Sequence, residues 1–139
     1  MARIKKEELH GVLKSKDENR YKYVLSHLCN GSIAHFSDCP NSLIELNNSN
    51  TSKKHIVLWS DKVFIDEFLK VNSNIKLKIE KVRLHKFYRE TLTSFIKQDI
   101  NLLIFPNVNG NGKIMTAKEF KIAMFKEIWE GWQEEWVFN

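Results

Sequence analysis

Long apolar runs are absent from this sequence. No stretch approaches the roughly 20 consecutive apolar residues with which a helix crosses a bilayer, and the first ten residues are mostly charged or polar. An N-terminus of this kind lacks the apolar segment of a secretory signal. We therefore predict a cytoplasmic protein that does not enter a membrane.

Cysteine is scarce, and its pattern argues against a metal site. Cys29 and Cys39 are the only two cysteines, and neither belongs to a Cys-x-x-Cys pair. With His27 and His35 they place four zinc-capable side chains in a short window, but His27 and Cys29 would not share a helix face. In a reducing compartment such cysteines are usually free and partly buried, and a disulfide would require export. We predict two buried thiols, no metal and no cofactor.

Catalytic motifs are also missing. The sequence has no nucleophile elbow, and no pair of carboxylates stands out by its spacing. Gly110-Asn111-Gly112-Lys113 lacks the spacing of a phosphate-binding loop and is followed by strand-like residues, so hairpin chemistry explains its glycines. A site assembled from distant residues would escape this search. An enzyme with an unrecognised site therefore remains an alternative to a non-enzymatic protein.

The residues that are present predict a single α+β domain over residues 1–139, with residues 1–16 as a peripheral N-terminal helix. The chain is 42% hydrophobic and 12% aromatic, which is enough for one packed core. Helical spacing of apolar residues predicts helices over 5–13, 17–30, 61–71 and 85–97, and a long helix from Ala117. Apolar or alternating stretches predict strands over 33–36, 43–46, 55–59, 75–79 and 102–105.

Local signals fix several boundaries. Asp17 and Asp61 are good helix N-caps, and the alternation of residues 75–79 slips near Glu80-Lys81, which predicts a bulge or strand end there. Asn109-Gly110 predicts a hairpin with a type I′ turn, and Thr116 with Glu119 forms a capping box. The expected fold is a mixed, mostly antiparallel sheet with helices packed on it, ending in a β-hairpin and a long helix.

Three motifs carry a resemblance to a known family. They are Val57-Leu58-Trp59 with Ser60 and the following Phe64 and Phe68; the helix with Phe87, Leu92 and Phe95; and Ile104-Phe105-Pro106-Asn107 with Gly110, Gly112 and Glu119. Over residues 21–126, and most strongly over 55–126, the chain resembles the bacterial domain of unknown function 2750 family. The resemblance implies no catalytic residues. Proteins of this general kind also resemble small immunity proteins encoded beside bacterial toxins, so a toxin is one implied partner.

The C-terminal helix carries a candidate binding surface. Trp129, Trp132 and Trp136 recur at i, i+3 and i+7, and Glu130, Glu134 and Glu135 lie among them as a polar rim. A stripe at helical spacing usually packs into the core. Tryptophan anchors with a polar rim are also typical of protein interfaces. Both interpretations stay open from the sequence alone.

The charge is unevenly distributed along the chain. Residues 53–90 hold ten Lys or Arg against five Asp or Glu, a net +5, whereas residues 91–139 hold five against six, a net −1. This asymmetry could guide a partner or a homodimer. Part of the basic segment lies beside aromatic residues, a combination that suits single-stranded nucleic acid. The candidate nucleic-acid-binding residues are Lys76, Lys78, Lys81, Arg83, Lys86 and Arg89.

Taken together, these patterns favour a non-enzymatic protein-binding domain. Its most specific form is an immunity-type inhibitor of a bacterial toxin, with a homodimer as a further option. A nucleic-acid-binding protein that uses the basic segment is the alternative, and a solvated strand face is the ordinary explanation of that segment.

Overall fold

A computed structural model describes the backbone of residues 5–138 and the side chains of residues 5–130. Its helices are α1 Lys6–Lys14, α2 Asp17–Cys29, α3 Asn41–Leu46, α4 Lys62–Val71, α5 Leu84–Lys86, the π-turn η1 Phe87–Thr91, α6 Leu92–Lys97 and α7 Ala117–Phe138. Its strands are β1 Ala34–Asp38, β2 His55–Trp59, β3 Glu80–Val82, β4 Asn101–Ile104 and β5 Lys113–Thr116. None of the described helices is long and apolar enough to cross a membrane.

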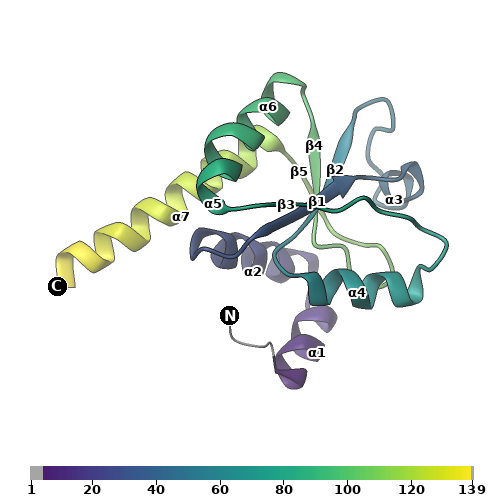
Figure 1. Ribbon diagram of the computed structural model, residues 1–139, viewed down its shortest axis with the longest axis horizontal. Helices are drawn as coiled ribbons and strands as arrows, with labels where there is room; N and C mark the ends of the chain where they lie inside the picture. Colours follow the sequence, from purple (N-terminus) through teal and green to yellow (C-terminus); the bar gives the residue numbers. More distant parts are fainter. Residues whose placement is uncertain (1–4, 139) are drawn as a thin grey trace.

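The five strands form one open sheet in the order β3-β1-β2-β4-β5 (Figure 1). Neighbouring strands are antiparallel except for β2 and β4, which pair in parallel with His55 opposite Asn101. Strands β4 and β5 form the C-terminal hairpin, and α7 follows β5 directly. The predicted fold class is therefore confirmed.

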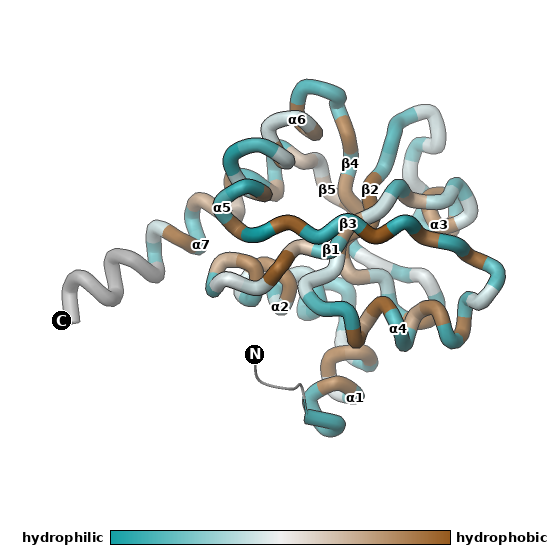
Figure 2. Tube along the Cα trace, viewed as in Figure 1, coloured by the Kyte–Doolittle hydropathy of each residue, from teal (hydrophilic) through white to brown (hydrophobic). Residues whose placement is uncertain are grey.

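Helices cover both faces of the central strands. Phe36 of β1 contacts Phe87 and Phe95 on one face, with ring centroids 6.0 and 5.5 Å away. Trp59 contacts Phe68 of α4 on the other face, at 5.5 Å. All five residues of β2 are buried, and hydrophobic residues gather on β2 and β4 (Figure 2). A strand covered on both sides reads as a continuous apolar run, which is why His55–Trp59 was recognisable in the sequence.

Two of the predicted helix caps are confirmed, and one is wrong although its helix begins where expected. Asp61 caps α4 by accepting a hydrogen bond from the Val63 amide at 2.9 Å. Thr116 and Glu119 form the capping box: the Glu119 amide donates to Thr116 Oγ1 at 3.0 Å, and the Thr116 amide donates to Glu119 Oε1 at 2.8 Å. Asp17 is not an N-cap, because α2 already includes it and its carboxylate pairs with Arg20 instead.

The strand predicted over residues 43–46 is wrong, since this segment is the helix α3. Pro40 occupies its N-cap position, and the Ile44 amide donates to the Pro40 carbonyl at 3.3 Å. Leu43 and Ile44 are both buried. Consecutive residues point to opposite faces of a strand, so burying both on one side of the molecule favours a helix.

The strand predicted over residues 75–79 is displaced. Only Glu80–Val82 pairs with β1, at the point where the alternation slips. Ile75, Leu77 and Ile79 still pack against the core, so the alternation reports a real apolar face. The Lys78 amide donates to Ser37 Oγ at 3.2 Å, which takes the place of a backbone ladder bond.

The hairpin connection is longer than the predicted type I′ turn. Of Asn109 and Gly110, only Gly110 has a positive φ, at 88°. The turn depends instead on Asn107, whose Oδ1 accepts hydrogen bonds from the amides of Asn109 and Asn111 at 3.0 and 3.1 Å. Asparagine side chains readily make such local turns.

Candidate functional site

Helix α7 has a buried face and an exposed apolar face. Phe120 and Met124 are fully buried, whereas Ile122 is 48%, Phe125 57% and Trp129 47% exposed. At 100° per residue, the three exposed residues fall within about 60° of one another and point away from Phe120 and Met124. We call Ile122, Phe125 and Trp129 the outer face of α7.

The residues predicted as a binding surface are described only in part. Trp129 is exposed, so the interpretation that it packs into the core is wrong, and Glu130 is exposed as well. The side chains of Trp132, Trp136, Glu134 and Glu135 lie outside the described residues.

A concavity adjoins this outer face. It has a volume of about 300 Å³ and lies between α7 and the segment formed by η1 and α6. Its apolar wall comes from Tyr88, Ile96, Ile122 and Phe125, and Lys118 and Lys121 complete its lining. We call it the α7 groove. It extends the apolar surface from one helix to two neighbouring elements.

The groove is basic at its rim. Lys121 donates from Nζ to Thr93 Oγ1 at 2.9 Å and lies over the Tyr88 ring at 5.0 Å from its centroid. Lys118 and Lys126 are exposed on the same helix. The charge sign reverses farther along α7, where Glu127, Glu130, Glu134 and Glu135 follow. The glutamate rim expected from the sequence therefore belongs only to the second half of the helix.

The start of α7 is held by its own electrostatics. The Thr116 amide donates to the Glu119 carboxylate, and this bond keeps the pKa of Glu119 below its ordinary value. A carboxylate at a helix N-terminus also interacts favourably with the helix dipole. The orientation of α7, and with it that of the outer face, is thus set at the end of β5.

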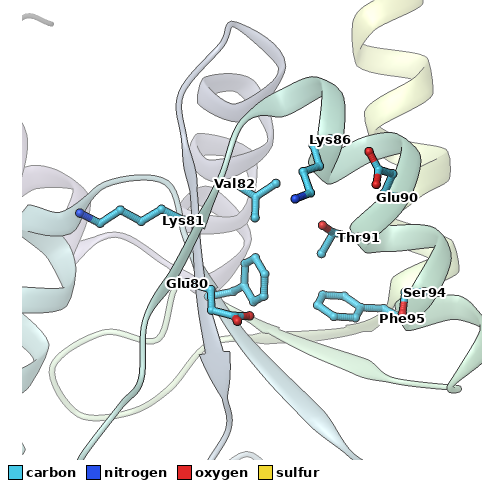
Figure 3. Close-up of a pocket in the computed structure, with 9 residues that line it drawn as sticks. Glu80, Lys81, Val82, Lys86, Glu90, Thr91, Ser94 and Phe95 are labelled. Atoms are coloured by element: carbon cyan, nitrogen blue, oxygen red, sulfur yellow. The ribbon is translucent and has the colours of Figure 1, made fainter.

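The basic segment is fully exposed. Lys76, Lys78, Lys81, Arg83, Lys86 and Arg89 are all exposed, and none forms an ion pair with a described residue. A shallow concavity of about 690 Å³ opens between β3 and the helices η1 and α6 (Figure 3). Lys86 points toward it, whereas Lys81 points away from it.

The aromatic residues that a nucleic-acid site would need are used elsewhere. Phe87 is 1% exposed in the core, and Tyr88 faces Lys121 and the α7 groove. Phe36 and Phe95, which floor the concavity beside β3, are 5% and 8% exposed, too little for a base to stack on them. Lysines on an edge strand also discourage pairing with other sheets. The segment therefore lacks the interleaved cations and aromatics that motivated the nucleic-acid hypothesis.

The zinc-capable residues near residue 30 have other partners. His27 Nδ1 lies 2.8 Å from the Tyr23 carbonyl, and its ring stacks on Tyr23. Cys29 and Cys39 are half-buried and form no disulfide, and burial raises the pKa of each thiol to about 12. Both thiols are therefore protonated at neutral pH. Within the described part of the chain, no three His, Cys, Asp or Glu side chains are grouped to hold a metal ion.

A buried arginine, Arg20, has almost no signal in the sequence. Arg20 is 1% exposed, and its guanidinium donates to the carbonyls of Ser15, Phe105 and Asn111 and pairs with Asp17. The Nε–Phe105 oxygen distance is 3.0 Å, and the Nη2–Asn111 oxygen distance is 2.6 Å. Arg20 thereby ties α2 to the connection between β4 and β5. The only local signal is the Asp17-x-x-Arg20 spacing, which indicates an ion pair on one helix face. It does not indicate that Arg20 bonds the carbonyls of Ser15, Phe105 and Asn111.

A serine and a histidine also meet without a sequence signal. Ser49 Oγ lies 2.7 Å from His55 Nε2, and His55 Nδ1 lies 2.9 Å from the Lys53 carbonyl. The His55 ring is only 1% exposed. A histidine this deeply covered cannot take a proton from a substrate. The pair secures the loop between α3 and β2 instead.

In comparisons with known proteins, no family model, curated protein or solved structure matches this chain. The resemblance to the domain of unknown function 2750 family stays a prediction.

Proposed function

We propose that this chain is a non-enzymatic protein-binding domain whose binding surface is the outer face of α7. The observation that carries the proposal is the exposure of Ile122, Phe125 and Trp129, each about half accessible to solvent on one helix face. Exposed apolar side chains that gather on one helix face often mark an interaction site. Aromatic side chains of this size are also the usual anchors of protein interfaces.

The α7 groove supports the same function. An interface anchor contributes most where it enters a pocket that excludes water, and the groove offers such a pocket beside Phe125. Lys118 and Lys121 at its edge would speed association with an acidic partner through long-range attraction. An immunity-type inhibitor that occupies a bacterial toxin is the most specific form of this proposal. The resemblance described from the sequence is its only additional support.

Site-specific photo-crosslinking tests the binding surface. A photoreactive phenylalanine analogue replaces Phe125 in one variant and Asp66, exposed on α4, in a matched control. We expect a crosslinked protein of defined mass from position 125 and none from position 66. The captured protein is then purified, and Phe125→Glu should weaken its binding by at least about 30-fold, the effect of an interface hot spot.

Two results would contradict the proposal. One is the absence of any protein crosslinked through position 125 in cells, a second copy of the chain included. The other is unchanged affinity of the purified partner for the Phe125→Glu variant. In either case the exposed apolar face would have no part in binding.

A further inference from the structure

Strand β3 leaves one edge of the sheet without a partner strand. It is outermost in the strand order, and β1 is the only described strand that pairs with it. Residues 75–79, which lead into β3, alternate between apolar and charged (Figure 2). Among the described residues, none outside β1 forms a hydrogen bond with the backbone of residues 76–82. We call residues 76–82 the β3 edge, and its outward-facing amides and carbonyls are available to another strand.

Two concavities lie side by side along the β3 edge. The larger, of about 690 Å³, has Glu80 and Val82 on one side and the helices η1 and α6 on the other (Figure 3). The smaller, of about 450 Å³, is lined by Lys76, Lys78 and Glu80. Phe36 and Glu80 line both, so the two concavities adjoin on one face of the sheet. A strand added at the β3 edge would direct every second side chain toward this face.

The β3 edge and the turn after it are basic. Residues 76–89 hold six Lys or Arg against one Glu, and all six cations are exposed and form no ion pair with a described residue. Two copies of this edge laid together would bring like charges into contact, which destabilises a strand pair. A strand that carries Asp or Glu would be attracted instead. The lysines that discourage pairing with an ordinary edge therefore favour an acidic partner over a second copy of the chain.

The two concavities favour different side chains. In the smaller one, Lys76 and Lys78 have no ion-pair partner among the described residues, whereas Asp38 already pairs with Lys54 at 3.5 Å. Carboxylates of a bound segment would therefore be attracted there. The larger one has an apolar floor formed by Val82 and two nearly buried phenylalanines. This floor suits an apolar side chain.

We propose that the β3 edge binds an extended, acidic segment of another protein, which joins the five-stranded sheet as an additional edge strand. Its acidic side chains lie beside Lys76 and Lys78, and one apolar side chain lies over Val82 in the larger concavity. Hydrogen bonds between the two backbones supply affinity, and the two concavities supply selectivity. The two concavities share no lining residue with the α7 groove. The β3 edge is thus a second binding surface, independent of the proposed function of α7.

Fluorescence polarisation of a labelled peptide tests strand addition. The probe is a short peptide in which Asp alternates with Val and one central Asp is replaced by Leu. Consecutive amides of a strand point to opposite edges, so only every second amide of the bound peptide faces β3. N-methylation of that set of amides should abolish binding. N-methylation of the other set should leave the dissociation constant nearly unchanged.

Charge reversal tests where the peptide binds. Lys76→Glu/Lys78→Glu should raise its dissociation constant about tenfold or more, because two attractions become repulsions. Lys22→Glu/Lys62→Glu makes the same change in net charge at exposed positions on α2 and α4, and it should have little effect. Phe125→Glu should have none, because the outer face of α7 is not involved. Circular dichroism confirms that each variant is folded before its binding is interpreted.

The inference fails when the peptide does not bind at its highest soluble concentration in low salt. Equal effects of the two sets of N-methyl groups would rule out strand addition, and equal effects of the two charge reversals would rule out the β3 edge. Loss of binding through Phe125→Glu would place the peptide on α7. Tighter binding of oligothymidylate, with displacement of the peptide, would make nucleic acid the ligand. Crosslinking through position 125 is measured separately, so the proposed function stands or falls on its own.

Discussion

Two regions of this protein reverse the usual distribution of side chains. At Arg20 a charged group is buried, and backbone carbonyls from Ser15, Phe105 and Asn111 accept its hydrogen bonds. On the outer face of α7 an aromatic side chain, Phe125, is 57% exposed. A buried charge is tolerated only when it is paired, so the first region belongs to the fold. No described residue buries the second, and the proposed function uses it as a binding surface.

Among polar substitutions, replacing Arg20 should have the largest effect on stability. Arg20→Met keeps much of the aliphatic volume but leaves the buried Phe105 carbonyl without its donor and removes the bonds to the part-buried carbonyls of Ser15 and Asn111. A buried unsatisfied group costs about 1–3 kcal/mol, so we expect a loss of about 2–3 kcal/mol in the free energy of unfolding. Urea denaturation measures it. Because the outer face of α7 is not involved, the binding affinity of the folded molecules should not change.

Arg89→Met is the matched control, because Arg89 is exposed and forms no ion pair with a described residue. Exposed substitutions usually change stability by less than about 0.5 kcal/mol. Equal losses at both positions would mean that the carbonyl contacts of Arg20 do not hold α2 to the β4–β5 connection.

Removing the capping box of Thr116 and Glu119 at the start of α7 should lower stability by less than replacing Arg20. Thr116→Ala removes the hydroxyl that accepts from the Glu119 amide, and the loss of an N-cap costs about 1 kcal/mol. Thr116→Ser keeps the hydroxyl and should stay close to the original in thermal unfolding. If alanine and serine gave the same midpoint, the bond would not contribute to the start of α7.

The sequence predicted those features that depend on neighbours in the chain. The capping box, the Asp61 cap and the buried strand β2 all carry their signal within a few residues. The tertiary ties of Arg20 do not, since its partners Phe105 and Asn111 lie 85 and 91 residues away. No local pattern encodes which of the four arginines will meet carbonyls from another part of the chain.

The errors in strand prediction have a similar cause. A short apolar run such as Leu43-Ile44 fits a strand or a helix equally well, and Pro40 at the N-cap position decides for the helix. The alternation of Ile75, Leu77 and Ile79 correctly reported one apolar face, but which residues join the ladder depends on β1.

The sequence leaves open for the same reason whether Trp129 packs into the core or lies at the surface. Helical spacing places Trp129 on the same stripe whether or not another element covers that stripe. Only the packing of α2 and α6 shows which side of α7 is covered.

Phe125→Ala has the smallest expected effect on stability, and it tests most directly whether the outer face of α7 belongs to the fold. Phe120 and Phe125 lie five residues apart on α7, but Phe120 is fully buried and Phe125 is 57% exposed. Phe120→Ala should cost about 3–5 kcal/mol, because it removes core contacts and leaves a cavity. Phe125→Ala should change the free energy of unfolding by less than about 0.5 kcal/mol. The same substitution would then distinguish two roles within one helix. Phe120 would stabilise the domain, and Phe125 would be left for the proposed binding. A loss of several kcal/mol at both positions would place Phe125 in the fold and remove the case for a binding surface on α7.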